Sequence, residues 1–205
     1  MAIAHGADAL GLVSAMPSGP GVVDEVLIAE IIAGVSVVGV PIATFLLTSK
    51  TDADSIIEQA KRCRPSTLQF VDAVAPHELG AIRDALPATK LVQVIHVVSE
   101  GSIDEAVAVG GGSPLVDAIL VDSGNPALKV KELGGTGRTH DWSLSKRIVD
   151  AVGVPVFLAG GLTPGNVAEA IKAVRPFGVD LCSGVRTNDA LDEKKLRKFV
   201  AAVRS

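Results

Sequence analysis

The chain has 205 residues, of which 48% are hydrophobic and 20% charged, so a large core is available and the disordered class is excluded. A formal net charge of −4 without a basic run, and only 3% aromatic residues, give no support for binding nucleic acid or an anionic membrane. Two distant cysteines, no apolar stretch of about 18 residues and no secretory signal predict a cytoplasmic protein without a disulfide framework or structural zinc.

Short apolar runs alternate along the chain with longer amphipathic ones, which predicts repeated strand–helix units. The expected strands are 9–13, 41–47, 67–71, 90–98, 117–121, 155–159 and 178–182. The expected helices are 24–34, 51–63, 76–86, 102–109, 143–152, 163–174 and 192–204, the first with an N-cap at Asp24. A long polar and glycine-rich loop, 123–142, separates the fifth strand from its helix.

Repeated strand–helix units imply right-handed crossovers and a parallel sheet, and the closed form of such a sheet has eight strands. The residues before Ala9 are too few for another strand and its helix. The sequence therefore predicts an α/β protein of the (β/α)8 TIM-barrel type with seven recognisable βα units, the first strand being absent, in a single domain over residues 1–205. An open doubly wound sheet is the alternative.

Function in parallel α/β folds lies at the carboxyl ends of the strands and in the loops that follow. Two glycine clusters, Gly160-Gly161 and Ser183-Gly184, follow the last two expected strands. Backbone amides in such loops, helped by a helix N-terminus, bind a phosphate well. The alternative is that these glycines only permit tight strand-to-helix turns.

Two carboxylates stand out at the same edge of the expected sheet. Asp122 ends the apolar strand 117–121, where partial burial favours the protonated form that a general acid needs. Asp180 lies inside the expected strand 178–182, where a bare carboxylate is costly. Asp122 is alternatively a loop cap, and Asp180 alternatively pairs with an arginine behind the sheet.

The loop before Trp142 is also a candidate for ligand binding, because long loops in compact domains are usually functional. Gly135 and Gly137 would let it fold over a ligand, with Arg138 or His140 adding charge; a solvated excursion is the alternative. We expect three further residues to be core residues rather than site residues, namely His96, Cys63 and Cys182.

Several of these segments together resemble the phosphoribosylanthranilate isomerase family. They are Gly134-Gly-Thr-Gly-Arg-Thr-His-Asp-Trp142, Leu158-Ala-Gly-Gly-Leu162, Val174-Arg-Pro-Phe-Gly-Val-Asp-Leu-Cys-Ser-Gly-Val185 and, near the start, Gly6-Ala-Asp-Ala-Leu-Gly11. The resemblance thus spans essentially the whole chain, and its carboxyl-terminal motifs are highly specific.

The resemblance implies an intramolecular oxidoreductase, an aldose–ketose isomerase of tryptophan biosynthesis that rearranges N-(5-phosphoribosyl)anthranilate without a cofactor or metal. A general acid opens the ribose ring, and a general base then removes the C2 proton. By motif position the acid is Asp122, while Asp180 lines the site. The glycines of the late loops hold the substrate, and its phosphate in particular; they are Gly135, Gly137, Gly160, Gly161 and Gly184, together with Ser183.

Two departures from the family pattern matter. The family's base is a cysteine in a Lys-Ile-Cys-Gly segment that ends the first strand, and neither Cys63 nor Cys182 occupies that place. The loop after the family's second strand carries an arginine near the anthranilate carboxylate, whereas residues 16–23 contain none here. Alternatives are therefore a non-catalytic phosphate-sugar binding protein, or an isomerase or lyase for another phosphosugar. Since seven strands leave two open edges, we also expect a homodimer.

Overall fold

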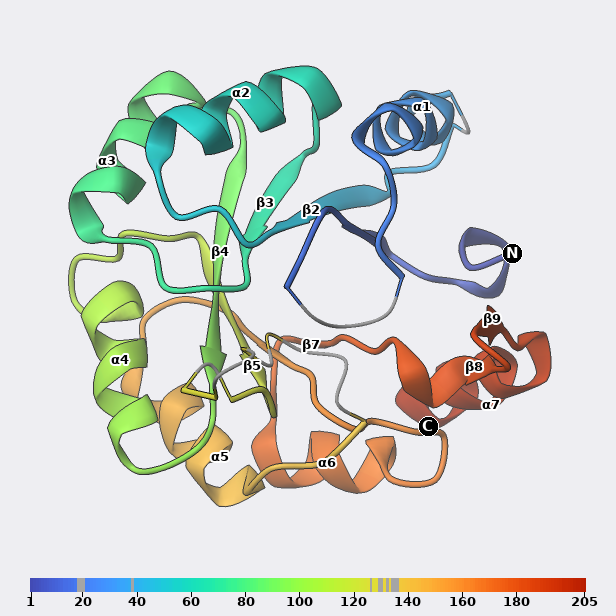
Figure 1. The fold of residues 1–205 in the computed structure, drawn as a ribbon. Coiled ribbons are helices and arrows are strands. Elements are labelled where there is room, and N and C mark those ends of the chain that lie inside the picture. The colour runs from blue at the N-terminus through green and yellow to red at the C-terminus, as the bar shows by residue number, and fades with distance from the viewer. Residues whose placement is uncertain (18–20, 38, 126, 129–130, 132, 134–136) are drawn as a thin grey trace.

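The computed structural model describes residues 1–205 except 18–20, 38, 126, 129–130, 132 and 134–136. Its main sheet has seven parallel strands paired in chain order, and the sheet curls into an arc with the helices outside (Figure 1). The strands are β1 (Ala9–Val13), β2 (Ala43–Thr48), β3 (Thr67–Phe70), β4 (Lys90–His96), β5 (Ala118–Asp122), β6 (Val156–Leu158) and β7 (Gly178–Val179). The helices are α1 (Glu25–Ser36), α2 (Ala53–Cys63), α3 (Pro76–Ala85), α4 (Gly101–Gly110), α5 (Trp142–Ala151), α6 (Val167–Val174) and α7 (Glu193–Val203). The predicted series of seven βα units is confirmed.

The central strands β3, β4 and β5 bury both faces, which explains why they read as nearly continuous apolar runs. In β5, Ile119 and Val121 join the large core with helix residues such as Ile148. Their neighbours Ala118 and Leu120 belong to a second, smaller cluster inside the arc. Because successive strand side chains alternate, the next residue, Asp122, lies on the inner face as well.

Aromatic rings fill part of this inner face. Phe157 of β6 contacts Phe45 and Phe177 edge to face, with ring centroids 6.0 and 5.4 Å apart. Gly178 of β7 leaves the space that the Phe157 ring needs, because a Cβ there would lie 2.8 Å from two ring atoms. Phe45 and Phe157 therefore contribute to the packing on the inner face, below the strand ends.

Aspartates cap four helices and so fix where the chain leaves the sheet. The side chain of Asp24 accepts a hydrogen bond from the backbone N–H of Val26 in α1, as the sequence predicts. Three more helices, α2, α5 and α7, are capped in the same way by Asp52, Asp141 and Asp192. Such caps contribute about 1 kcal/mol each.

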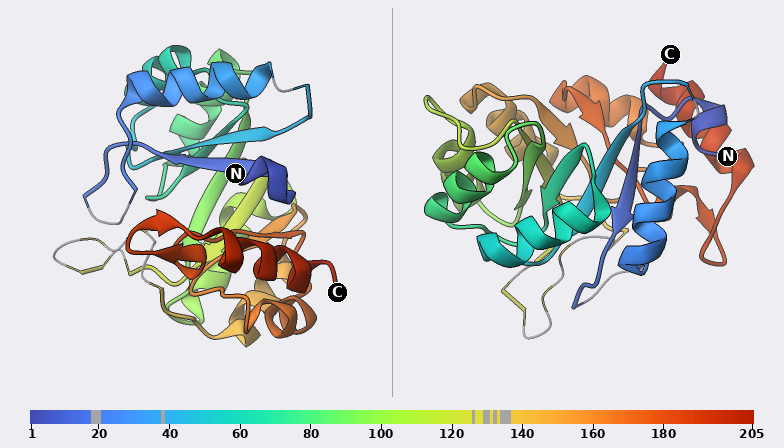
Figure 2. Two further views of the ribbon diagram at one scale, coloured as in Figure 1. Left: turned by 90° about the vertical axis from the view of Figure 1, so that its right-hand side faces the viewer. Right: turned by 90° about the horizontal axis from the view of Figure 1, so that it is seen from above.

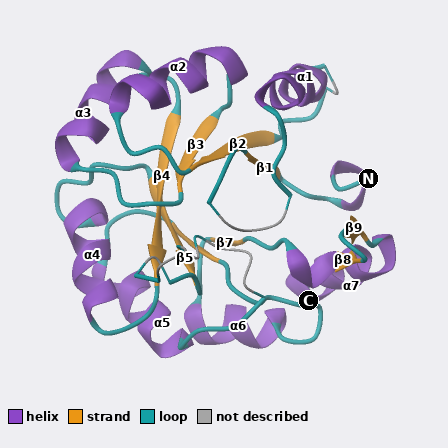
Figure 3. Cartoon of the chain, viewed as in Figure 1, coloured by secondary structure: helices purple, strands orange, loops and turns teal. Residues whose placement is uncertain are grey.

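The arc stays open between β1 and β7, which are not paired, and both chain termini lie on that side (Figure 3). The amino-terminal 3-10 helix, Ile3–His5, lies against α7, where His5 Nε2 is 3.0 Å from Glu193 Oε1 and Arg204 donates to the carbonyl of Gly6. Figure 2 shows both ends together beside the open edge. This turn covers α7 and adds no strand to either edge.

The structure corrects two boundaries near the site. The last strand, expected over 178–182, contains only Gly178–Val179, so Asp180 follows the strand instead of lying inside it. Its neighbour β6 is three residues long and offers only two partners to β7, which ends the pairing. The sixth helix starts at Val167, not at residue 163, because Asn166 Oδ1 holds the backbone N–H of Thr163 in a turn.

A short hairpin after the last parallel strand was not expected. Its strands are β8 (Arg186–Thr187) and β9 (Ala190–Leu191), joined by Asn188 and Asp189 with φ of 49° and 61°. Asn-Asp at two left-handed positions is a recognised hairpin signal. No helix in the described part of the chain has the length and apolarity needed to span a membrane.

Candidate active site

Asp122 is the last residue of β5 and is 8% exposed on the inner face of the sheet. The backbone N–H of Ser123 donates to its Oδ1 at 2.7 Å and fixes one carboxyl oxygen. His96, the last residue of β4, is its direct partner in the strand register. The carboxyl group is thus held at the mouth of the arc, where the sequence places a general acid.

Most of the predicted site residues line one pocket of about 50 Å³, which is large enough for only one end of a substrate. These are Asp122, Gly137, Gly160, Gly161, Asp180 and Ser183, and the remaining walls are Ala159, Leu162, Leu181 and Cys182. Gly184 lies next to this pocket in the 3-10 helix Ser183–Val185. The predicted binding residue Gly135 lies outside the described residues.

The glycines allow loops from different strands to approach closely. Gly161 has a φ of 61°, and a Cβ there would lie 2.5 Å from the carbonyl carbon of Arg138. A Cβ on Gly184 would lie 1.9 Å from the backbone oxygen of Leu162. These contacts are backbone to backbone, so side chains larger than hydrogen would push the loops apart. The close packing is compatible with both predictions for these glycines, a tight turn and a phosphate cradle.

The two carboxylates influence each other. Desolvation and then the negative charge of Asp122 raise the pKa of Asp180 to about 6, although the N–H of Leu181 opposes this rise. Asp180 as a residue remains exposed to water, although many protein atoms surround its carboxyl group. Asp180 is therefore disposed to take up a proton as the pH falls toward 6.

The loop before α5 places His140 next to this pair. Its Nε2 is 2.6 Å from Ser145 Oγ, and its Nδ1 is buried with no hydrogen-bond partner among the described residues. Burial lowers the pKa of His140, while the charges of Asp122 and Asp141 act in the opposite direction. His140 is therefore neutral at pH 7. The sequence named it only as a source of charge, and its contact with buried Ser145 was not foreseen.

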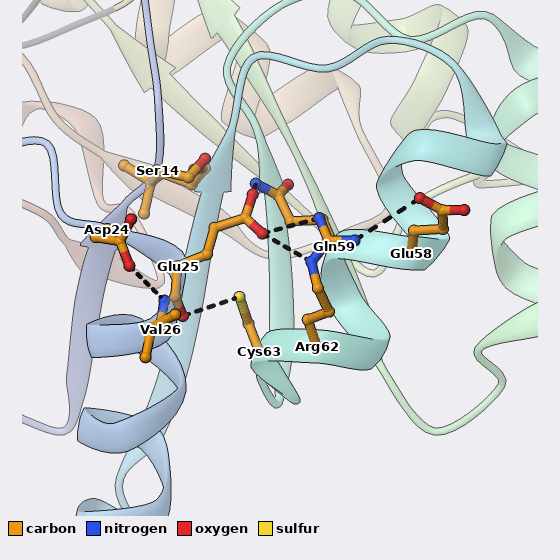
Figure 4. A network of polar contacts seen from close by, with 9 residues as sticks. Ser14, Asp24, Glu25, Val26, Glu58, Gln59, Arg62 and Cys63 are labelled. Carbon is orange, nitrogen blue, oxygen red and sulfur yellow. Dashed lines mark hydrogen bonds and ion pairs between the residues drawn. The ribbon is translucent and has the colours of Figure 1, made fainter.

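The two cysteines lie in different surroundings. Figure 4 shows Cys63 between α1 and α2, with its Sγ 3.8 Å from the carbonyl oxygen of Glu25, and burial raises the pKa of the thiol. Glu25 pairs there with Arg62, and Gln59 donates to the same carboxylate (Figure 4). Cys182 lines the pocket, and burial raises its pKa too. Cys63 has the environment expected of a packing thiol, whereas Cys182 is at the mouth.

Arg186 is a candidate that the sequence did not single out. It follows the 3-10 turn at Ser183, and its Nη1 donates to the carbonyl of Asp189 at 3.0 Å. Its Nη2 reaches across the open side to within 3.2 Å of the point where Gly21 would carry a Cβ. Gly21 belongs to the loop 16–23, which lacks an arginine of its own. Only the tertiary structure brings this guanidinium to that loop.

A much larger hollow, of about 940 Å³, lies over α1 and the loop after β1. Its walls include the apolar residues Val22, Val26, Ala29 and Ala33, and two of its charged residues, Glu25 and Arg62, are paired with each other. None of the predicted site residues contributes to its described walls. Size alone therefore does not locate the chemistry, and we place the site at the smaller pocket.

Comparisons with known proteins identify the family of the chain. The family described as N-(5'phosphoribosyl)anthranilate (PRA) isomerase matches residues 33–202. The N-(5'-phosphoribosyl)anthranilate isomerase of Haloarcula marismortui is 38% identical over 202 residues, covering 97% of this chain and 86% of the relative. That of Methanocella arvoryzae is 36% identical over 164 residues, covering 80% and 73%.

Solved structures agree on the fold. The phosphoribosyl anthranilate isomerase of Thermococcus kodakaraensis superposes with a TM-score of 0.76 at 25% identity, covering 96% of this chain and 88% of that one. The match of the family over most of the sequence, the identity of the relatives and the shared fold have one explanation. The chain belongs to the N-(5'-phosphoribosyl)anthranilate isomerase family.

Proposed function

We propose that this chain catalyses, in the cytoplasm, the isomerisation of N-(5'-phosphoribosyl)anthranilate to the carboxyphenylamino-deoxyribulose phosphate in tryptophan biosynthesis. The observation that carries the proposal is the single pocket that combines Asp122 and Asp180 with glycine loops from two successive strands. A solved phosphoribosyl anthranilate isomerase binds reduced 1-(o-carboxyphenylamino)-1-deoxyribulose 5-phosphate, a ligand with the phosphate and carboxylate that such a site must hold.

In this proposal Asp122 is the general acid. Its carboxyl group, fixed by Ser123 on the inner face, protonates the ribose ring oxygen, so that the bond from that oxygen to C1 breaks as the nitrogen lone pair forms a C=N bond. Loss of the C2 proton to a base then gives an enol. Backbone amides in the loops at Gly160 and Ser183 bind the phosphate, since amides can hold an anion in a protein of net negative charge.

Arg186 is our candidate for the partner of the anthranilate carboxylate. A guanidinium binds a carboxylate through two parallel hydrogen bonds, and Arg186 faces the loop 16–23 at Gly21. The backbone carbonyl of Asp189 and the side chain of Cys182 each interact with it, and the five N–H donors of a guanidinium leave others for a ligand. The guanidinium of Arg186, which comes from the other side of the open arc, would therefore supply the positive charge that loop 16–23 lacks.

The test is turnover of the purified chain on N-(5'-phosphoribosyl)anthranilate, followed as loss of substrate fluorescence, in parallel with Asp122→Asn. We expect the variant to lose about 10³-fold in kcat, because general acid catalysis contributes about 10²- to 10⁴-fold. Its affinity for the reduced product should stay within a few-fold. Unchanged turnover in the variant would show that the acid is another group. Binding of the reduced product without turnover by the wild-type chain would instead favour a phosphate-sugar binding protein.

We also propose that the chain forms a homodimer. Apolar side chains are exposed along the open side and the adjoining helix, with Phe177 72%, Val26 68% and Val22 51% exposed. Such surface is costly to leave in water, and unpaired strand edges favour association. The Thermotoga maritima relative is described as a dimeric enzyme. Light scattering at micromolar concentration tests this, and a monomer with a cooperative melt would rule it out.

A further inference from the structure

Two buried histidine nitrogens, one at the end of β4 and one in the loop before α5, have no hydrogen-bond partner among the described residues. Within the described part of the chain, the Nδ1 atoms of His96 and His140 are each inaccessible to water and make no hydrogen bond. A buried ring nitrogen without a partner is costly, so it calls for an explanation. Both rings are neighbours of the same carboxyl group, that of Asp122.

His96 offers Asp122 a hydrogen-bond acceptor. Its Nε2 lies 2.9 Å from the carbonyl oxygen of Val71, and a carbonyl only accepts, so Nε2 carries the proton. In the neutral ring Nδ1 is then a bare lone pair. His96 and Asp122 are partners in the register of two parallel strands, so their side chains lie side by side on the inner face.

His140 offers the opposite chemistry, a donor. Its Nε2 is 2.6 Å from the hydroxyl of Ser145, a residue that is fully buried. The imidazole is the partner that this hydroxyl has in the described structure, so the hydroxyl satisfies its own donor by giving its proton to Nε2. The proton of the neutral ring then resides on Nδ1.

Gly160 brings this donor to Asp122. The point where Gly160 would carry a Cβ is 2.9 Å from His140 Nδ1 and 3.0 Å from the backbone nitrogen of Ser123. That same nitrogen donates to Asp122 Oδ1. The charge of Asp122 also acts on His140. Any side chain at Gly160 would separate the ring from the carboxyl group.

We propose that His96 and His140 are positioning residues that stabilise alternate protonation states of Asp122: His96 Nδ1 accepts a hydrogen bond from the protonated carboxyl, and His140 Nδ1–H donates one to the carboxylate. The inference rests on the proposed function for its catalytic consequence, and its structural part stands without it. The acid is held by His96 before ring opening, and the anion is stabilised by His140 after it.

The proton count closes. Asp122 gives its proton to the ring oxygen, where it remains as a hydroxyl. The base that takes the proton from C2 returns it to C1, and the enol hydroxyl at C2 gives its proton back to Asp122 as the ketone forms. No oxidant or cofactor enters. The two histidines keep their own protons throughout, which separates this role from that of a general acid or base.

Other charged groups face the same region and enter the pH dependence. Asp180, from the segment after β7, adds a negative charge beside Asp122. Asp141, at the start of α5, acts on His140. Lys131 and Asp72 pair with each other on the same rim. Substitutions at His96 and His140 leave these four charged groups unchanged.

The kinetic test uses histidine variants that keep one ring nitrogen each. A glutamine amide replaces Nε2 and removes the Nδ1 function, whereas an asparagine amide replaces Nδ1. We expect His96→Gln to move the alkaline limb of the kcat profile to lower pH by about half a unit to one unit, because the protonated carboxyl loses its acceptor. We expect His140→Gln to move the limb to higher pH by a similar amount, because the carboxylate loses its donor. Shifts of this size correspond to the loss of one hydrogen bond. His96→Asn should restore the limb toward its wild-type position.

The control is His77→Gln, a change at an exposed histidine of α3, which should leave the profile where it is. If the wild type is active but the alkaline limbs of His96→Gln and His140→Gln move in the same direction, or do not move, the inference is wrong. Loss of turnover in the wild type itself would be a failure of the proposed function. The affinity for the reduced product should stay within a few-fold in all variants.

A second measurement needs no activity. The chain has four histidines, so single substitutions assign each ring in long-range ¹H–¹⁵N spectra. At pH 7 we expect His96 to be protonated on Nε2 and His140 on Nδ1. In Asp122→Asn the pKa of His140 should fall further, because the lost charge raises it in the wild type. Identical tautomers, or a pKa of His140 that does not respond, would refute the arrangement.

Discussion

Two regions of this molecule solve opposite problems. The early wall, β1–β4 with α1–α3, has strands of five, six, four and seven residues. The late rim, the loops that follow β5–β7, grows from strands of five, three and two residues. The strands of the wall pair with their neighbours over more residues than the strands of the rim do. At the rim, loops take the place of strand residues and bring polar groups together.

A carboxylate in each region shows the same contrast. In the wall, burial acts to raise the pKa of Glu25, but hydrogen bonds from Arg62 and Gln59 outweigh it and the pKa is lowered. At the rim, desolvation and then the negative charge of Asp122 raise the pKa of Asp180 to about 6. The carboxylate of Glu25 in the wall is paired with an opposite charge, whereas the rim places the carboxyl groups of Asp122 and Asp180 next to each other. This is the pattern expected where the structure stores destabilisation for chemistry.

The largest effect should come from the wall. Phe70, a side chain of β3 with 0% exposure, packs among the helix residues of the main core. We expect Phe70→Ala to lower the free energy of unfolding by about 3–5 kcal/mol, measured by urea titration, because it leaves a cavity that the neighbours only partly fill. Turnover per folded molecule should stay within a few-fold. A loss below about 1 kcal/mol would mean that the wall is loosely packed.

A glycine of the rim and a glycine of the wall should respond differently to substitution by alanine, with smaller effects than the loss of Phe70. Gly184→Ala places a methyl group 1.9 Å from a backbone oxygen, so the rim loops must move apart. We expect about 30- to 100-fold weaker binding of the reduced product by calorimetry, the loss of one or two charge-assisted hydrogen bonds. Gly80→Ala in α3, which has open space around it, should instead stabilise the fold by about 0.5–1 kcal/mol. Equal effects of the two changes would erase the contrast.

The open side links the two regions, because Arg186 of the rim meets the loop after β1 at Gly21. We expect Arg186→Met to raise KM about tenfold with kcat within a few-fold, since it removes a partner of the substrate carboxylate and not a reacting group. Arg186→Lys should recover part of that loss. A fall in kcat at unchanged KM would move Arg186 from substrate binding to the chemistry.

The smallest effect concerns stability against pH. Since the folded state raises the pKa of Asp180 from 3.8 to about 6, its ionised form destabilises the fold above pH 6, and this penalty is relieved as the pH falls from 6 toward 4. Asp180→Asn should therefore stabilise the protein at pH 7.5 by at most about 1 kcal/mol, because solvent screens the carboxylate, and by nothing near pH 4. Thermal melts across this range test it, and parallel curves would contradict it.

The amino-acid sequence by itself determined the repeated βα units and the edge of the sheet at which function lies. Alternation of apolar runs and amphipathic runs is a local property, and parallel strands bring all their carboxyl ends to one edge. The sequence therefore predicts that Asp122 and the glycine loops are neighbours. The sequence predicted the bounds of individual strands less well. Of the expected strand 178–182, only Gly178–Val179 is paired.

Only the tertiary structure decided which distant groups meet. His96 was expected to be a core residue, and its position beside Asp122 depends on the register of β4 against β5, which no single segment encodes. The approach of Arg186 to Gly21 depends on how far the sheet curls before it ends. Such contacts join residues far apart in the chain, and curvature and register are set by the packing of the whole core. Local periodicity carries no information about either.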